Sequence, residues 1–246
     1  MELELKDKVV LVTGSSRGIG KSILESFQKE NCTVIGNSRH GLKIDNISKQ
    51  KNFDYFVADM TKKEDCQKLS EYIKKKYGKL DILICNVGNG NLPKNKTNEF
   101  QMMLEKNFFS SLNIIFSLKK MLEKSKGSIV CISSIAGIES TQAPISYGTA
   151  KAALNFFVKG ISKEFGNKGI RINAVAPGNI IFKDSVWEKK ISENSTQVKK
   201  MLKKEVAMKR FGNPEEISNI VLFLASPLAS FMTGSVIVSD GGQVKS

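Results

Sequence analysis

Short runs of apolar, mostly β-branched residues recur along the chain at regular intervals. In most of these runs the apolar residues follow one another directly instead of alternating with polar ones. This pattern is typical of strands in a parallel sheet that is covered on both faces. We therefore predict a parallel sheet of about seven strands. The runs are Val9–Val12, Thr33–Ile35, Tyr55–Val57, Ile82–Cys85, Ser128–Ile132, Arg171–Val175 and Val236–Val238.

Longer segments with helical spacing of their apolar residues separate these runs. Alternating β and α elements predict a Rossmann-like, doubly wound α/β fold with helices on both faces of the sheet. Because the chain has no internal repeat, low-complexity block or linker, we expect one domain that covers residues 1–246. The helical segments are Ile19–Glu30, Lys62–Tyr77, Thr97–Glu123, Tyr147–Phe165 and Glu215–Leu224.

Two of these helices, over 97–123 and 147–165, carry more apolar residues than contact with one sheet needs. From Phe108 to Phe116, for example, the apolar residues extend well beyond one stripe. Such helices are either deeply buried or form a contact between subunits. We favour the contact, and so expect a homo-oligomer, either a dimer or a tetramer.

The segment from Ile180 to Arg210 fits no strand–helix unit of the predicted sheet. It is long, rich in lysine and contains Trp187, and the α/β pattern resumes only at Pro214. Long insertions beside a ligand site often form lids. We expect a substrate lid at about 180–210.

The charge of the chain is strongly positive, with 38 Lys and Arg against 24 Asp and Glu. Only Arg17, Arg39, Arg171 and Arg210 are arginines, although base and phosphate recognition favour arginine over lysine. We therefore interpret the excess as a lysine-rich solvated surface, and expect no nucleic acid partner. An anionic substrate or an acidic carrier protein remains an alternative.

Several classes of site and location are disfavoured by composition. His40 is the only histidine, and Cys32, Cys66, Cys85 and Cys131 form no CxxC pair, so we expect no metal site. The N-terminal residues do not resemble a signal peptide, and no stretch has the length and apolarity of a membrane helix. We expect a cytoplasmic protein with no membrane contact. Acid–base chemistry would then depend on Tyr, Lys, Asp or Glu.

A glycine-rich turn follows the first predicted strand and opens the first helix. Such a turn presents backbone N–H groups and the helix dipole to a pyrophosphate. Gly14 permits the tight turn, Gly18 lets the backbone approach the phosphate, and Gly20 permits close helix packing. We predict a dinucleotide site whose turn residues are Gly14, Ser16, Arg17, Gly18, Ile19 and Gly20.

The second predicted strand indicates which dinucleotide binds. NAD-preferring sites place an acidic residue after this strand to hold the ribose 2′-hydroxyl. Here the strand leads to Asn37, Ser38 and Arg39, with no acid. Arg39 and Arg17 both suit a 2′-phosphate, which a carboxylate would repel. We predict that NADP(H) is the cofactor.

Ser134, Tyr147 and Lys151 form a candidate catalytic group. Ser134 ends a predicted strand, and Tyr147 and Lys151 share one helix face because they are four residues apart. For a tyrosine to exchange protons at neutral pH, its pKa must fall from about 10 by about three, which takes roughly 4 kcal/mol. One ammonium about 4 Å away supplies energy of that order. We predict proton transfer by Tyr147, assisted by Lys151, with Ser134 orienting the substrate oxygen.

Together these residues resemble the short-chain dehydrogenase/reductase family from Lys8 to Gly242, nearly the whole chain. The motifs that carry the resemblance are Thr13-Gly14-x-x-x-Gly18-x-Gly20, Ser134, Tyr147-x-x-x-Lys151, Pro177-Gly178, Arg210-Phe-Gly-Asn-Pro-Glu-Glu-Ile, and Thr233-Gly with Asp240-Gly241-Gly242.

The resemblance implies a role for further residues. Tyr147 would be the acid/base, and Lys151 would also hold the nicotinamide ribose. Asn107 would keep a water molecule in a proton relay, and Asp59 with Met60 would contact adenine.

The remaining cofactor contacts implied by the resemblance lie elsewhere in the cleft. Asn86 and Gly88 would line its floor, Pro177 and Gly178 would border it, and the backbone of Ile180 would meet the carboxamide. The family usually forms tetramers through the two apolar helices described above.

Three departures from the family pattern bear on the substrate. Cys85-Asn-Val87-Gly88 replaces Asn-Asn-Ala-Gly, Phe182 stands where a Thr often binds the carboxamide, and Asn89-Gly-Asn91 forms a polar loop. The overall pattern resembles 3-oxoacyl-acyl-carrier-protein reductases, with Lys126 and Lys168 near the expected carrier side. Reductases of sugars, polyols or other small ketones share the same motifs, and a catalytically silent NADP-sensing module is a third possibility.

Overall fold

The computed structural model describes residues 2–41, 52–92 and 98–245. Its centre is a seven-stranded, all-parallel sheet in the order β3-β2-β1-β4-β5-β6-β7, so the doubly wound prediction is confirmed. The strands are β1 (Val9–Val12), β2 (Thr33–Ser38), β3 (Phe53–Val57), β4 (Ile82–Cys85), β5 (Ser128–Ile132), β6 (Arg171–Pro177) and β7 (Val236–Ser239).

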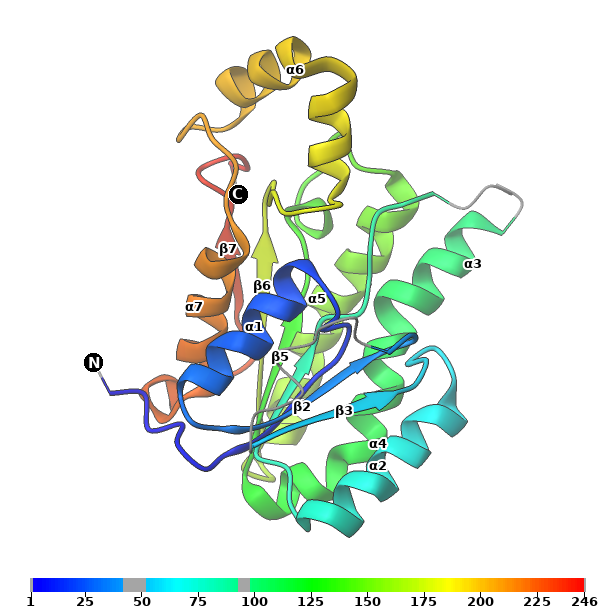
Figure 1. Cartoon of the computed structure of the whole chain (residues 1–246), viewed down its shortest axis with the longest axis vertical. Coiled ribbons are helices and arrows are strands. Elements are labelled where there is room, and N and C mark those ends of the chain that lie inside the picture. Colours follow the sequence, from blue (N-terminus) through cyan, green and yellow to red (C-terminus); the bar gives the residue numbers. More distant parts are fainter. Residues whose placement is uncertain (1, 42–51, 93–97, 246) are drawn as a thin grey trace.

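The helices cover both faces of this sheet (Figure 1). They are α1 (Gly18–Lys29), α2 (Lys63–Tyr77), α3 (Glu99–Leu104), α4 (Ser110–Ser125), α5 (Ile145–Gly166), α6 (Val186–Glu205) and α7 (Pro214–Ala225). Short 3₁₀ turns follow β5 and α7, at Ile135–Gly137 and Pro227–Ala229.

The apolar strand residues divide between two cores. On one face, Leu11 and Cys131 pack with α2, α4 and α5, whereas Val10 and Ile132 pack on the other face with α1 and α7. This division follows from the alternation of side chains along each strand. It explains why the strands are apolar at successive positions: both faces are buried.

Local sequence fixes where several helices begin and end. Asn213 and Glu216 form a capping box at the start of α7, with Pro214 at its first position. At the other end of a helix, Gly78 terminates α2 with a φ of +70°, in the left-handed region that glycine adopts without strain.

The predicted helix over 97–123 is interrupted. A π-helical turn, Glu105–Phe109, separates α3 from α4 and contains Asn107, and the predicted starting residue, Thr97, lies outside the described residues. π-turns widen a helix by one residue and occur often at functional sites. Hydrophobic periodicity does not reveal such an insertion, because apolar residues continue on both sides of it.

The segment 180–210 contains α6, a helix that the sequence analysis did not predict. Figure 1 shows α6 beyond the carboxyl end of β6, away from the sheet. The helix is kinked at Asn194, and Val198, Leu202 and Val206 form a small core of their own. We call residues 180–210 the α6 segment. Its base is fixed where Ile181 N–H donates to the Gly212 carbonyl at 2.9 Å.

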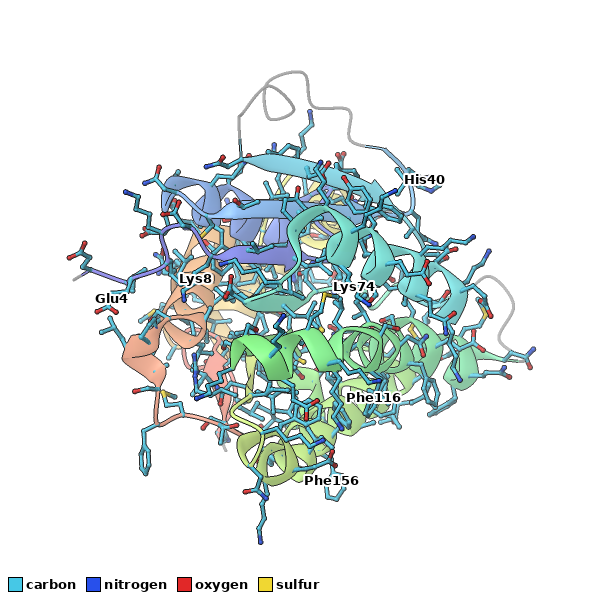
Figure 2. The ribbon with its side chains drawn as sticks, turned by 90° about the horizontal axis from the view of Figure 1, so that it is seen from below. Glu4, Lys8, His40, Lys74, Phe116 and Phe156 are labelled. Carbon is cyan, nitrogen blue, oxygen red and sulfur yellow. The ribbon has the colours of Figure 1, made fainter. Side chains whose placement is uncertain are left out.

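The two strongly apolar helices bury only part of their apolar surface. Ile114 and Ile115 of α4 are buried, but Phe116 is 49% and Phe156 79% exposed. Figure 2 shows both phenylalanines on the outer side of α4 and α5. None of the described helices is both long and apolar enough to cross a membrane.

Candidate active site

A cleft of about 390 Å³ lies at the carboxyl ends of the strands. Open α/β sheets bind ligands at this edge, where the strand order reverses. Apart from Gly18 and Asn107, every site residue predicted from the sequence lines the cleft. Those lining it are Gly14, Ser16, Arg17, Ile19, Gly20, Arg39, Asp59, Met60, Asn86, Gly88, Ser134, Tyr147, Lys151, Pro177, Gly178 and Ile180.

The glycine turn has the geometry that a dinucleotide requires. Gly14 and Gly18 adopt positive φ angles, +63° and +56°, and α1 begins at Gly18, so its free N–H groups face the cleft. A Cβ atom on Gly20 would come within 2.4 Å of the Gly14 carbonyl oxygen. The side-chain amide of Asn86 fixes the turn, because Nδ2 donates to the carbonyls of Thr13 (3.1 Å) and Gly14 (3.0 Å).

Gly18 is covered by the α6 segment. A Cβ atom there would lie only 2.6 Å from the Phe182 ring. Arg17 is engaged with the same segment, because its Nη1 donates to the Asp184 carbonyl at 3.0 Å. The turn therefore contacts the α6 segment through two adjacent residues, which the sequence did not indicate.

The second strand ends in polar residues that face the same cleft. Arg39 is exposed at its rim, and Ser38 accepts a hydrogen bond from the Tyr55 hydroxyl at 2.6 Å. Asn37 is fully buried: Nδ2 donates to Phe56 and Ala58 carbonyls, whereas Oδ1 has no partner among the described residues. A guanidinium and a hydroxyl at the end of a strand that carries no acidic residue suit a phosphate.

The β3–α2 connection borders the cleft with Asp59 and Met60. The Asp59 carboxylate accepts hydrogen bonds from the backbone N–H and the hydroxyl of Thr61, at 3.0 and 2.9 Å. Its own N–H donates to Asp65 at 2.9 Å. Asp59 thus shapes this connection, and its predicted contact with adenine stays a prediction.

Ser134, Tyr147 and Lys151 lie together in the cleft. Ser134 follows β5 and caps the 3₁₀ turn at Ile135–Gly137, which places its hydroxyl within hydrogen-bond reach of Tyr147. Lys151 is 3% exposed, and its Nζ lies 5.9 Å from the centroid of the Tyr147 ring. The same ammonium donates to the Ile132 carbonyl at 2.7 Å.

The electrostatics of this group differ from the sequence-based expectation. Burial raises the pKa of Tyr147, and only the hydrogen bond with Ser134 opposes the rise. Burial also lowers the pKa of Lys151 to about 8. The expected lowering of the tyrosine pKa by Lys151 is therefore absent, because removal from water destabilises both ionised forms. Tyr147 holds its proton in this structure.

Asn107 lies behind the cleft, in the π-turn. Its Nδ2 donates to the carbonyls of Asn89 (3.2 Å) and Met103 (3.1 Å), and its buried Oδ1 has no partner among the described residues. A Cβ atom on Gly88 would lie 2.4 Å from that oxygen and 3.2 Å from Lys151 Nζ. An unpaired acceptor beside Lys151 suits a bound water molecule, which is the predicted role of Asn107.

Some residues in the cleft wall were not among the predicted site residues. Lys106 precedes Asn107 in the π-turn, Asn91 belongs to the polar loop, and Val186 with Trp187 comes from the first turn of α6. A long unassigned insertion with a tryptophan was the signal available for α6. No pattern marked Lys106. In the described ranges, no three His, Cys, Asp or Glu side chains form a metal-binding group.

Comparison with known proteins places these motifs in a family. A family model described as Enoyl-(Acyl carrier protein) reductase matches residues 14–243. The 3-oxoacyl-(acyl-carrier-protein) reductases FabG of Thermotoga maritima and Aquifex aeolicus are 31% and 34% identical to the chain, covering 98% of it and 100% and 99% of their own lengths. The crystal structure of L-sorbose reductase from Gluconobacter frateurii, complexed with NADPH and L-sorbose, superposes with a TM-score of 0.90 at 26% identity and full coverage of both chains. The glycine turn, the Ser134–Tyr147–Lys151 group and the similarity along the whole chain agree, and the chain belongs to the short-chain dehydrogenase/reductase family.

Proposed function

We propose that this chain is an NADPH-dependent carbonyl reductase whose substrate is a 3-oxoacyl group carried on an acidic carrier protein. The observation that carries the proposal is the meeting of Ser134, Tyr147 and Lys151 in one cleft with the glycine turn. The full-length similarity to FabG proteins supports the choice of substrate.

The cofactor fits the residues present. The turn offers free N–H groups to a pyrophosphate, and Arg39 with Ser38 offers a cation and a hydroxyl to a 2′-phosphate. When bound, the reduced nicotinamide supplies the hydride to the carbonyl carbon. We propose that Lys151 and the backbone of Ile180 hold the nicotinamide end and that Asp59 and Met60 border the adenine.

Each catalytic side chain then has one task. The Ser134 hydroxyl donates a hydrogen bond to the substrate carbonyl oxygen and orients it. Tyr147 donates its phenolic proton to the same oxygen as negative charge develops there. Lys151, held by the Ile132 carbonyl, places a positive charge next to the phenol at pH values below about 8. Asn107 would bind the water through which Lys151 regains contact with solvent.

A small polyhydroxylated ketone is the second candidate substrate, and a specific feature favours it. The cleft continues into an outer cavity of about 640 Å³, and the two share Asn91, Asp184, Ser185 and Val186. The rest of the outer cavity is polar, with Glu188, Lys189 and Ser192. Hydroxyl groups of a sugar or polyol would find hydrogen-bond partners along this path.

Loss of NADPH absorbance at 340 nm tests both substrates. The purified chain is mixed with NADPH and either a 3-oxoacyl thioester of the carrier protein or a series of ketoses. We expect turnover of the thioester, and turnover at least about 100-fold slower by a Tyr147→Phe variant. Turnover of ketoses alone would favour the second candidate. If neither the thioester nor any ketose causes loss of NADPH absorbance, both candidate substrates are contradicted.

We also propose that the chain forms a homo-oligomer through α4 and α5. Phe116 and Phe156 expose apolar surface on this side of the molecule (Figure 2), and Phe109, just before α4, is also exposed. Phe116 and Phe157 stack edge to face, with ring centroids 6.2 Å apart, so the two helices present a continuous aromatic surface. Burial of such a surface stabilises subunit contacts.

A further inference from the structure

The glycine turn holds the beginning of the α6 segment through two contacts that cofactor recognition does not require. The Phe182 ring lies against Gly18, and Arg17 Nη1 donates to the Asp184 carbonyl. Arg17 was predicted to bind a 2′-phosphate. In this structure it also joins the turn to the segment that covers the cleft.

The Asp184 carbonyl is held in place by its own local structure. Asp184 has a φ of +62°, a left-handed conformation that aspartate tolerates better than most residues. Its N–H donates to Glu188 Oε2 at 2.6 Å, and the Ser185 hydroxyl caps α6 by accepting from Glu188 N–H at 3.1 Å. A rigid, capped turn therefore presents this carbonyl to Arg17.

The two halves of the α6 segment are anchored differently. The later half packs on the small core of Val198, Leu202 and Val206. After α6, Met208 N–H also donates to the Gly241 carbonyl at 3.0 Å, which ties this half to the rest of the domain. The earlier half contains Val186 and Trp187, which line the cleft, and it follows directly on the Phe182 and Asp184 contacts. The position of these two lining residues therefore depends on Arg17 and Phe182.

We propose that Arg17 is a positioning residue that holds the start of α6 over the cleft and thereby couples binding of a 2′-phosphorylated dinucleotide to closure of the substrate site. The cofactor part of this inference rests on the proposed function. A guanidinium has five N–H donors in a planar fork, so the bond to Asp184 leaves others for a phosphate.

The coupling is reciprocal. An Arg17 side chain already held by Asp184 is oriented for the phosphate, and a phosphate that holds Arg17 stabilises its bond to Asp184. NADPH should therefore close the α6 segment more than NADH does, although both carry the same nicotinamide. The size of the effect is modest because Arg17 and Asp184 are both exposed.

Hydrogen exchange of the backbone amides in residues 186–193 measures this closure without any turnover. We expect Arg17→Met to speed exchange of these amides about fivefold in the absence of cofactor, the scale of one hydrogen bond. Arg39→Met is the matched control, because it removes the other predicted phosphate contact but no contact with α6, and should leave this exchange unchanged. Equal exchange in the wild type and Arg17→Met would overturn the proposal.

Saturating cofactor tests the coupling. In the wild type, NADPH should slow exchange of these amides more than NADH does, and the difference should vanish in Arg17→Met. Equal protection by the two cofactors in the wild type would refute the coupling. In NADH-dependent assays, Arg17→Met should raise KM for the ketone about fivefold, which loss of a 2′-phosphate contact alone does not explain. If no carbonyl is reduced, the proposed function fails, and the cofactor-free exchange experiment still decides whether Arg17 positions α6.

Discussion

Replacing Lys151 by methionine should make the protein more stable while abolishing its activity. Lys151 is almost fully buried, and within the described part of the chain its ammonium donates one hydrogen bond, to the Ile132 carbonyl. Burial lowers its pKa from 10.5 to about 8. Methionine has a similar length and no charge to desolvate, so the substitution removes the cost of burying an ammonium.

The pKa of Lys151 sets the size and sign of this effect. The difference between 10.5 unfolded and about 8 folded corresponds to about 3 kcal/mol against folding at pH 7. Between these two values the unfolded chain binds more protons, so the free energy of unfolding of the wild type rises with pH. Losing the bond to Ile132 costs Lys151→Met about 1 kcal/mol. We expect the variant to be about 2 kcal/mol more stable than the wild type at pH 7.

Urea unfolding followed by circular dichroism, at pH 7 and at pH 9.5 and equal protein concentration, tests the reasoning. Raising the pH to 9.5 should remove about 2 kcal/mol of the free energy that burial of the Lys151 ammonium costs the wild type. The difference in free energy of unfolding between Lys151→Met and the wild type should then nearly vanish. Other titrating groups are common to both proteins and cancel in the difference. A difference that stays constant between the two pH values would show that Lys151 is not a buried, destabilised cation.

Three further changes probe the site and the surface. Tyr147→Phe should lower kcat at least about 100-fold, the scale of one general acid, and retained turnover would mean that the proton comes from another group. Arg39→Asp should shift preference from NADPH toward NADH, because a carboxylate repels a 2′-phosphate; unchanged selectivity in KM measurements would refute that assignment. Phe156→Glu should lower the molar mass found by light scattering at micromolar concentration, and a wild type that is already monomeric would contradict the α4–α5 interface.

The sheet could be predicted from sequence because most positions of its strands are apolar, on both faces. Runs such as Val9–Val12 and Ser128–Ile132 were predicted with the bounds that the structure gives. Other strands extend further: β6 continues to Pro177 and β2 to Ser38. These extra residues carry little apolar signal, and the hydrogen bonds of neighbouring strands decide whether they belong to the sheet.

The candidate site could be predicted where a local motif fixes the geometry. The turn from Gly14 to Gly20 and the four-residue spacing of Tyr147 and Lys151 depend on neighbouring residues alone. The placement of Phe182 on Gly18 depends on contacts between residues distant in the chain, as does the bond from Arg17 to Asp184. No periodicity encodes such contacts, so the function of the α6 segment becomes visible only in three dimensions.

The pKa values of Tyr147 and Lys151 depend on the same long-range burial, and they set the protonation states of the two side chains at neutral pH. A raised pKa keeps the proton on the Tyr147 phenol at neutral pH, which is the form that donates a proton to a carbonyl oxygen. Alcohol oxidation needs the phenolate, which the buried site disfavours. Below about pH 8 Lys151 is charged, so its positive charge lies beside the phenol at the pH where reduction would run. At neutral pH the site therefore holds a cationic Lys151 next to a neutral phenol, despite the cost of burying the ammonium, and this arrangement is suited to donating a proton to a ketone oxygen.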